Sequence, residues 1–288
     1  MTKDQLLTRL SSTTAVLTRR RALLAGAAVV GAAGTAGVLA SVIGEEPVGP
    51  ALPAAGPPAR RTVKSSAYRL QPLTGYGPPH TSHRRTPVRH EPLLKVSGRG
   101  RTMVLSFDDG PDPRYTPHIL DTLAEHDVRA MFFVCGEMAV GNQDLLARMS
   151  DEGHVVGNHT WSHPLLTRLS RSRIRSEMER TCDVIEDAYG ERPEWFRAPY
   201  GAWNRAAFQL GAELGMDPLA WTVDTLDWTA PAARTIVGRV ENGAAPGVVV
   251  LSHDAGGDRS QSVRALRDYL PQLLDSGYHI TVPRRHYA

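Results

Sequence analysis

The sequence has 288 residues, of which 41% are hydrophobic, and a formal net charge of +3. Residues 1–100 carry 14 Lys and Arg against 4 Asp and Glu, whereas residues 101–288 carry 19 against 26. The larger C-terminal region is therefore mildly acidic, which argues against a nucleic-acid-binding domain there and predicts no nucleic-acid partner. The basic N-terminal region is either a solvated segment or a tail that contacts an anionic wall or membrane surface.

The N-terminal segment, residues 1–44, has the pattern of an export signal. Three arginines, Arg19 to Arg21, precede an uncharged stretch over residues 22–43 that is rich in Ala, Gly and Val. Paired arginines before a weakly hydrophobic core resemble a twin-arginine signal peptide. The stretch is long enough to span a bilayer as a signal anchor, but its Ala and Gly content favours export. We expect an exported protein, extracellular or associated with the cell wall, with membrane contact only through residues 22–43 if the segment is uncleaved.

Residues 45–99 form the predicted linker. Ten of the 21 prolines fall within residues 44–100, where neither helical nor strand periodicity occurs. Such a composition is typical of an extended, disordered linker and not of a folded module.

Residues 100–288 alternate short apolar runs with amphipathic stretches, as expected for one catalytic domain. The predicted strands are residues 103–107, 130–134, 154–157, 195–197, 219–223, 247–251 and 279–282. The predicted helices are residues 116–126, 142–152, 170–189, 204–214, 232–241 and 262–276. Ser170 and Asn204 are suitable N-caps for two of these helices, and Gly190 lies where one of them should end.

The alternation of strands and helices predicts the α/β class, with parallel strands covered by helices. About seven strands favour a deformed (β/α) barrel, one strand short of the usual eight, and an open doubly wound sheet is the alternative. Five polar motifs follow predicted strands: FDDG, NHTWSH, FRAPYG, VDTLDW and LSHD. Because the C-terminal ends of parallel strands share one face of a domain, we expect these motifs to meet there.

The motifs FDDG and NHTWSH together predict a metal site. Asp109, His159 and His163 would supply one carboxylate and two imidazoles, a set that binds a divalent transition metal and leaves positions open for water and substrate. Asp108 would then be free to take a proton from that water as a general base. The same residues are also good turn formers, and both interpretations can hold together. The pattern indicates metal-assisted hydrolysis.

The remaining motifs supply candidate partners for that chemistry. Arg197 can brace a carboxylate with its planar guanidinium, and we expect Asp108 to be its partner. Pro199 and Tyr200 begin a rigid turn whose backbone N–H groups can face a developing oxyanion.

The motif LSHD supplies a candidate general acid. His253 would protonate the leaving group, held by a carboxylate that raises its pKa, with Asp227 the first choice and Asp224 the second. Trp228 and Leu251 would form an apolar wall for a small methyl group. Ordinary core packing is the alternative for Trp228.

The two cysteines, Cys135 and Cys182, form no CxxC pair, which excludes a thiolate zinc site. Both lie in stretches expected to be buried. Two buried thiols are therefore favoured, while a disulfide stays open.

The five motifs, in this order, resemble those of the polysaccharide deacetylases of carbohydrate esterase family 4, the NodB-type homology domain. The resemblance covers roughly residues 100–283. It implies a deformed (β/α) barrel, one divalent metal ion, usually zinc and sometimes cobalt, and hydrolysis of acetyl groups from amino-sugar polymers or from xylan. Ser106 stands where the family often has threonine, and Ala198 where it often has a second proline.

The resemblance also implies a role for each candidate residue. Asp108 matches the base, Arg197 the arginine that orients it, His253 the acid and Asp227 the carboxylate that tunes the acid. The other matches are the three metal ligands Asp109, His159 and His163, the oxyanion donor in the Tyr200 N–H, and the acetyl-pocket residues Trp228 and Leu251. We also expect Pro199 to contact substrate.

From these residues we expect an exported, metal-dependent hydrolase of linear amide bonds that removes N-acetyl groups from peptidoglycan or chitin-type sugars with metal-activated water. Its partner would be an acetylated polysaccharide, and a monomer is the default state. The alternatives are an acetylxylan O-esterase of the same fold and a catalytically silent wall-binding protein.

Overall fold

The computed structural model describes residues 86–97 and 100–283. The predicted signal segment and residues 45–85 of the predicted linker lie outside the described residues. Within the described part of the chain, no helix combines the length and the apolar character that crossing a membrane requires.

The sheet is the centre of the domain, and all of its strands run parallel. Along the sheet the order is β5-β4-β3-β2-β1-β7-β6, and β8 pairs with β1 beside this path. The strands are β1 (Thr102–Asp108), β2 (Met131–Val134), β3 (Val155–Asn158), β4 (Trp195–Phe196), β5 (Asp217–Pro218), β6 (Val223–Asp224), β7 (Val249–His253) and β8 (His279–Ile280). The seven strands of the path form a curled half-barrel, which confirms the predicted deformed (β/α) barrel.

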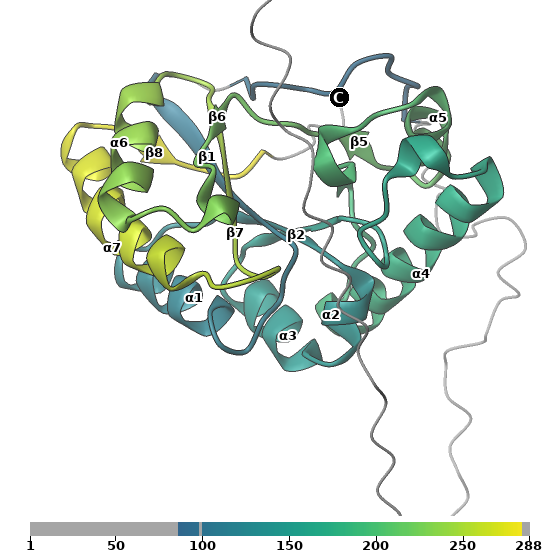
Figure 1. Cartoon of the computed structure of the whole chain (residues 1–288), viewed down its shortest axis with the longest axis horizontal. Coiled ribbons are helices and arrows are strands. Elements are labelled where there is room, and N and C mark those ends of the chain that lie inside the picture. The colour runs from purple at the N-terminus through teal and green to yellow at the C-terminus, as the bar shows by residue number, and fades with distance from the viewer. Residues whose placement is uncertain (1–85, 98–99, 284–288) are drawn as a thin grey trace, which may run out of the picture. The chain divides into compact units, whose positions relative to one another are not determined.

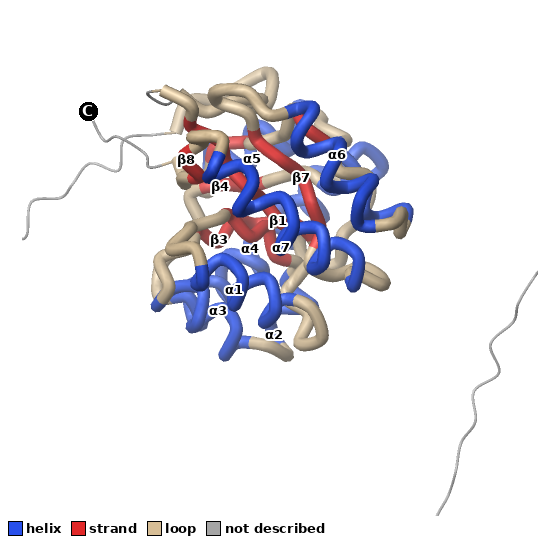
Figure 2. The backbone as a smooth tube through the Cα atoms, turned by 90° about the vertical axis from the view of Figure 1, so that its left-hand side faces the viewer, coloured by secondary structure: helices blue, strands red, loops and turns tan. Residues whose placement is uncertain are grey.

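The helices lie along the outside of the curled sheet, with α6 and α7 near one end and α4 and α5 near the other (Figure 1). Figure 2 shows the same layering from the side, with helices outside the strands. The α-helices are α1 (Thr116–Glu125), α2 (Gly136–Val140), α3 (Gln143–Asp151), α4 (Arg171–Tyr189), α5 (Arg205–Glu213), α6 (Ala233–Gly243) and α7 (Ser260–Asp275). Three short 3-10 helices are η1 (Leu166–Arg168), η2 (Pro199–Gly201) and η3 (Asp227–Thr229).

Local sequence signals account for several helix ends. The Ser170 hydroxyl accepts a hydrogen bond from the Arg173 N–H, and the Asn204 side chain accepts one from the Ala207 N–H, so both are N-caps as predicted. Gly190 ends α4 with a φ of 94°, a conformation that favours glycine. The helix α2 is not among the predicted helices, because five residues are too few to show helical periodicity.

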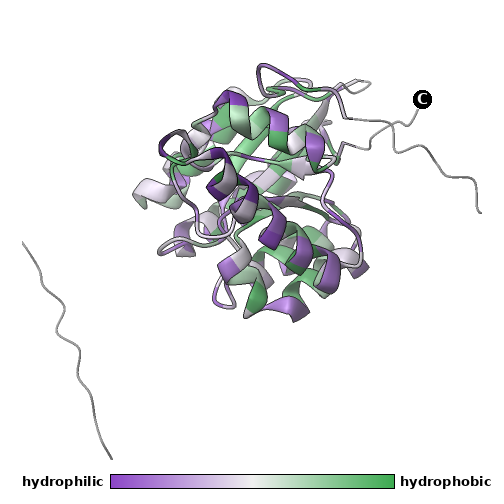
Figure 3. Cartoon of the chain, turned by 90° about the vertical axis from the view of Figure 1, so that its right-hand side faces the viewer, coloured by the Kyte–Doolittle hydropathy of each residue, from purple (hydrophilic) through white to green (hydrophobic). Residues whose placement is uncertain are grey.

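The core lies between the sheet and the helices. The strand β1 is buried from Met103 to Asp108, and the ring of Phe107 stacks on that of Phe132 at 5.3 Å between centroids. Figure 3 shows hydrophobic residues on the strands and on the inward sides of the helices, with hydrophilic residues outward. This burial fixes the ends of the strands in space.

One predicted strand is wrong. Residues 219–223 do not form a single strand, because the chain breaks there between β5 and β6. The guanidinium of Arg197 donates to the carbonyl oxygens of Leu219 and Ala220, at 3.0 and 3.1 Å. In a continuous strand these carbonyl oxygens would accept hydrogen bonds from a neighbouring strand. The apolar pattern of residues 219–223 does not reveal that the buried Arg197 side chain binds them instead.

Residues 86–97 pack on the domain, although they fall within the predicted linker. The Leu93 N–H donates to the Pro218 carbonyl and the Ala220 N–H donates to the Leu93 carbonyl, both at 2.8 Å. Arg89 forms an ion pair with Asp217 at 3.0 Å. Contacts with the domain therefore begin before residue 100, the boundary predicted from composition.

We predict that Leu93→Pro destabilises the domain, because proline removes the N–H that bonds to Pro218. The loss of one partly buried backbone hydrogen bond should lower the free energy of unfolding by about 1–3 kcal/mol. Denaturant unfolding measures this change. Leu94→Pro is the matched control, since the Leu94 side chain is exposed and its N–H makes no backbone hydrogen bond in the described part of the chain. Equal stabilities of the two variants would contradict the pairing.

Candidate active site

The polar motifs converge at the C-terminal ends of the strands, as predicted. Asp108 and His253 are the last residues of β1 and β7, and they are partners in the register of these neighbouring strands. His159 directly follows β3, and Arg197 directly follows β4. Asp227 lies in η3, shortly after β6. Residues separated by up to 145 positions in the sequence thus share one site.

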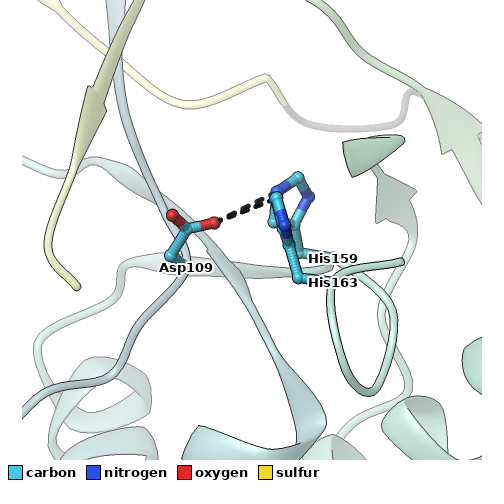
Figure 4. A group of neighbouring side chains, drawn as sticks. All are labelled: Asp109, His159 and His163. Carbon is cyan, nitrogen blue, oxygen red and sulfur yellow. Dashed lines mark ion pairs between the residues drawn. The ribbon is translucent and has the colours of Figure 1, made fainter. Parts of the chain in front are cut away.

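Asp109, His159 and His163 form a compact group of metal-type donors. Their donor atoms all lie within 4.8 Å of one another. The Asp109 Oδ1 lies 3.5 Å from the His159 Nε2 and 3.3 Å from the His163 Nε2. Figure 4 shows the carboxylate facing the two imidazoles, which come from one loop on the opposite side of the site.

The environment of this group fits a cation. The His159 Nδ1 lies 2.8 Å from the Arg197 carbonyl oxygen, and because a carbonyl only accepts, Nδ1 must carry the proton. In the neutral ring the Nε2 lone pair then faces the Asp109 and Asp108 oxygens, at 3.5 and 3.6 Å. The buried Asp109 Oδ1 has no hydrogen-bond partner among the described residues. A positive ion between these donors would satisfy all of them, and one carboxylate with two imidazoles suits a divalent transition metal.

Asp109 is ionised at neutral pH. Burial raises the pKa of its carboxyl, but in the metal-free protein the neighbouring imidazoles in their protonated forms, His159 first and then His253 and His163, outweigh burial and lower the pKa to about 2. An ionised carboxylate is the form that binds a metal.

The loops that carry these residues are held in an uncommon backbone conformation. Asp109, His163 and Tyr200 all have positive φ, at 76°, 54° and 60°. Non-glycine residues in this region are strained by about 1–3 kcal/mol and persist where their surroundings fix them. Gly256 approaches the site from the loop after β7, where its φ is +77° and a Cβ would lie 2.6 Å from the Asp109 Oδ2. This position therefore requires glycine.

Asp108 is held by Arg197, the pairing expected from the sequence. The Arg197 Nη1 donates to the Asp108 Oδ1 at 2.6 Å and to the Ser106 Oγ at 3.0 Å. The guanidinium is fully buried and lies over the ring of Phe133, 4.0 Å from its centroid. Only the Asp108 Oδ2 is left to face the metal-type donors.

His253 is paired with Asp227, the first choice from the sequence. The His253 Nδ1 donates to the Asp227 Oδ1 at 2.7 Å, and the His253 backbone N–H donates to Oδ2 at 2.9 Å. Burial lowers the pKa of His253, but Asp227, with smaller contributions from Asp108 and Asp109, raises it to about 9. The second choice, Asp224, instead accepts from the Leu226 N–H.

The predicted substrate-pocket residues differ in exposure. The residues Tyr200 and Trp228 are 68% and 57% exposed, whereas Pro199 and Leu251 are buried. The Tyr200 ring lies against that of His163, with 4.5 Å between centroids. Exposed aromatic rings beside a cluster of polar donors are suited to contact a bound molecule. The high exposure of Trp228 argues against ordinary core packing.

Sequence reasoning missed several residues that support the site. The Ser262 hydroxyl donates to the Asp227 Oδ2 at 2.6 Å. The Arg259 guanidinium donates to the Asp227 backbone carbonyl oxygen at 3.1 Å. Asp254 is buried and accepts from the Gly110 N–H at 3.1 Å and from the Thr116 hydroxyl at 2.6 Å. Burial, together with Asp109 and Asp108, raises the pKa of Asp254 to about 7. The one sequence feature that could have identified Asp254 is its position as the last residue of the motif LSHD.

The cysteines are buried free thiols, which confirms the favoured alternative to a disulfide. The Cys135 Sγ lies 3.8 Å from the His159 carbonyl oxygen, and the Cys182 Sγ lies 3.3 Å from the Asn158 amide nitrogen. Burial raises the pKa of both thiols, so neither is an activated nucleophile.

Comparison with known proteins agrees with this geometry. The sequence profile described as polysaccharide deacetylase matches residues 95–219. A chitooligosaccharide deacetylase from Bradyrhizobium is 38% identical over 204 residues, which cover 66% of this chain and 93% of the relative. A peptidoglycan-N-acetylglucosamine deacetylase from Bacillus cereus is 38% identical over 183 residues, which cover 63% of this chain and 66% of the relative.

A solved structure shows the same fold. The crystal structure of the Bc1960 peptidoglycan N-acetylglucosamine deacetylase superposes with a TM-score of 0.64 and 36% sequence identity, covering 66% of this chain and 89% of that one. Because a relative with 38% identity is matched over nearly its whole length, the chain belongs to the polysaccharide deacetylase family.

Proposed function

We propose that this protein is a metal-dependent polysaccharide deacetylase that hydrolyses N-acetyl groups of amino-sugar polymers of the peptidoglycan or chitin type. The observation that carries the proposal is the group of Asp109, His159 and His163 beside the held carboxylate of Asp108. The relatives support the substrate class, since they are named for deacetylation of peptidoglycan N-acetylglucosamine and of chitooligosaccharides.

Asp109, His159 and His163 would hold the metal ion, for which zinc is our first choice and cobalt the second. Such an ion, when bound, polarises a carbonyl group and makes water more acidic. One oxygen and two nitrogens suit either metal.

Asp108 is the proposed base. It takes a proton from the attacking water, whose oxygen then adds to the acetyl carbon. Arg197 occupies the Asp108 Oδ1 at 2.6 Å, so the proton must go to Oδ2, the oxygen on the side of His159. The guanidinium therefore orients the base.

His253 is the proposed acid. It gives its Nε2 proton to the sugar nitrogen as the carbon–nitrogen bond breaks, and acetate and a free amine leave. The bond to Asp227 uses Nδ1, so the proton on Nε2 is the one that faces outward to the reaction. With a pKa of about 9 the ring carries this proton at neutral pH.

The remaining residues would bind the acetyl group. We assign the Tyr200 backbone N–H as the donor to the developing oxyanion, supported by the contact of its ring with His163. Trp228, Leu251 and Pro199 would contact the acetyl methyl and the sugar.

We also propose that the protein is exported and acts as a monomer. The proposal of export rests on Arg19 to Arg21 before the apolar residues 22–43. Fractionation of expressing cells tests it, and a purely cytoplasmic full-length protein would contradict it.

The test of the function is acetate release by the full chain, loaded with zinc or stripped by a chelator. We expect metal-dependent acetate release from chitooligosaccharide or peptidoglycan. Release from acetylxylan alone would make the protein an O-esterase. Silence on all three polymers despite bound metal would contradict deacetylation and favour a wall-binding protein.

We predict that Asp108→Asn abolishes turnover but keeps metal binding. The amide cannot take the proton from water, so kcat should fall by about 10²–10⁴-fold. Acetate release measures kcat, and calorimetric titration of the metal-free protein measures metal affinity. Asp144→Asn, on the exposed side of α3, is the control and should match the wild type. A kcat within tenfold of the wild type would overturn the assignment of the base.

We predict that Asp227→Asn shifts the alkaline limit of activity to lower pH. Asp227 is the main group that raises the His253 pKa against the effect of burial, so removing its charge should lower that pKa from about 9. The acid must be protonated to act, so activity should be lost as pH rises through the lower value. An NMR titration of metal-free protein and the pH profile of kcat/KM measure the two changes. An unchanged alkaline limb would remove His253 as the acid.

A further inference from the structure

A buried carboxylate outside the proposed catalytic set holds the loop that carries two of the proposed metal ligands. Glu177 lies in α4 and is 5% exposed. Its Oε2 accepts hydrogen bonds from the Trp161 N–H at 3.0 Å and from the Ser162 N–H at 2.8 Å. The Ser162 hydroxyl lies 3.2 Å from both carboxylate oxygens. All of these partners lie between His159 and His163 in the sequence.

The same loop is held from a second side. The Gly136 and Glu137 N–H groups, at the start of α2, donate to the Thr160 and Trp161 carbonyl oxygens at 3.0 and 3.1 Å. The guanidinium of Arg180, one helical turn after Glu177, lies over the Trp161 ring at 3.7 Å. The loop is therefore fixed between α2 and α4.

The energetics of Glu177 point to a role beyond satisfying backbone groups. No Lys, Arg or His in the described part of the chain forms an ion pair with the Glu177 carboxylate, and the hydrogen bonds that its oxygens accept all come from the loop. Burying a carboxylate in this way is costly. Ser162 is exposed, so water can satisfy its N–H without Glu177. What water cannot supply is a fixed loop conformation.

Strain in the loop supplies the reason for such a restraint. Thr160 and His163 have φ values of 70° and 54°, in the left-handed region that these residues avoid. A loop released from Glu177 would relax toward ordinary φ values, and His163 is the end of the loop that no other element of the site holds by a hydrogen bond in the described residues. Its Nε2 would then leave its place 3.3 Å from the Asp109 Oδ1.

We propose that Glu177 is a positioning residue that holds loop 159–163 so that His163 faces Asp109 before a metal ion binds. The proposal rests on the proposed function, because it assumes that these three side chains are metal ligands. Glu177 would act through the loop backbone and touch neither metal nor substrate. Partners that orient metal ligands typically contribute about 10–100-fold in metal affinity.

The test is the zinc affinity of the full-length, metal-free protein, measured by calorimetric titration. Glu177→Ala should bind zinc about 10–100-fold more weakly than the wild type. Glu177→Gln should recover most of the affinity, because its amide oxygen can accept both N–H groups. Glu179→Ala is the control on the same helix. Its half-exposed side chain pairs with Arg175, and its zinc affinity should equal that of the wild type.

Further readouts separate positioning from folding. Thermal unfolding of the metal-free variants shows whether the fold is kept, and the absorption spectrum of the cobalt-loaded protein reports the ligand geometry. If Glu177→Ala does not fold, Glu177→Asp takes its place, because the shorter carboxylate keeps the charge but cannot reach both N–H groups. A folded Ala or Asp variant with wild-type zinc affinity and an unchanged cobalt spectrum would overturn the proposal. A wild-type protein that binds no zinc would instead overturn the proposed function.

Discussion

The buried side chain of Arg197 connects the sheet, the proposed base and the proposed metal site. Its guanidinium donates to the Leu219 and Ala220 carbonyl oxygens where the sheet breaks, and to Asp108 at the end of β1. Its own carbonyl oxygen accepts from the His159 Nδ1 and so sets which nitrogen of that ring faces Asp109. One residue thus leaves a single oxygen of the base and a single nitrogen of a ligand pointing into the site.

Charge balance explains why the proposed site requires a cation. Asp108 is compensated by Arg197, and Asp227 by His253. Asp109 has no Arg or Lys partner in the described part of the chain, and its buried Oδ1 has no hydrogen bond. Asp254 is buried close by, and its pKa is raised to about 7. Burial is the main cause, and the negative charges of Asp109 and Asp108 add to it. A divalent ion at the three donors would supply a positive charge beside Asp109.

The parts of the fold with regular periodicity were predictable from sequence. The helices α4 and α5 begin at the predicted N-caps Ser170 and Asn204. The motifs lie together because the C-terminal ends of parallel strands share one face of the domain. The spacing within the motifs was also informative. One aspartate of the pair, Asp109, and the two histidines, His159 and His163, are ligands that one metal site can use together. These features are local, so a single sequence reveals them.

The errors and omissions have a common physical origin in long-range hydrogen bonds. The strand predicted over residues 219–223 is broken by a guanidinium 22 positions away, and Leu93 pairs with the sheet from within a proline-rich stretch. Glu177 reads as an ordinary acidic residue on α4, because its bonds to Trp161 and Ser162 leave no local pattern. Buried polar groups of this kind are specified by tertiary packing, and periodicity does not report them.

An anomalous-scattering measurement at the zinc edge, on crystals of the zinc-loaded protein, tests the proposed metal site most directly. If Asp109, His159 and His163 hold the ion, one strong peak should lie at bonding distance, about 2.0–2.2 Å, from a carboxylate oxygen of Asp109 and from the Nε2 atoms of both histidines. A fully loaded crystal with no peak at these three side chains, or with its zinc bound elsewhere, would contradict this metal site.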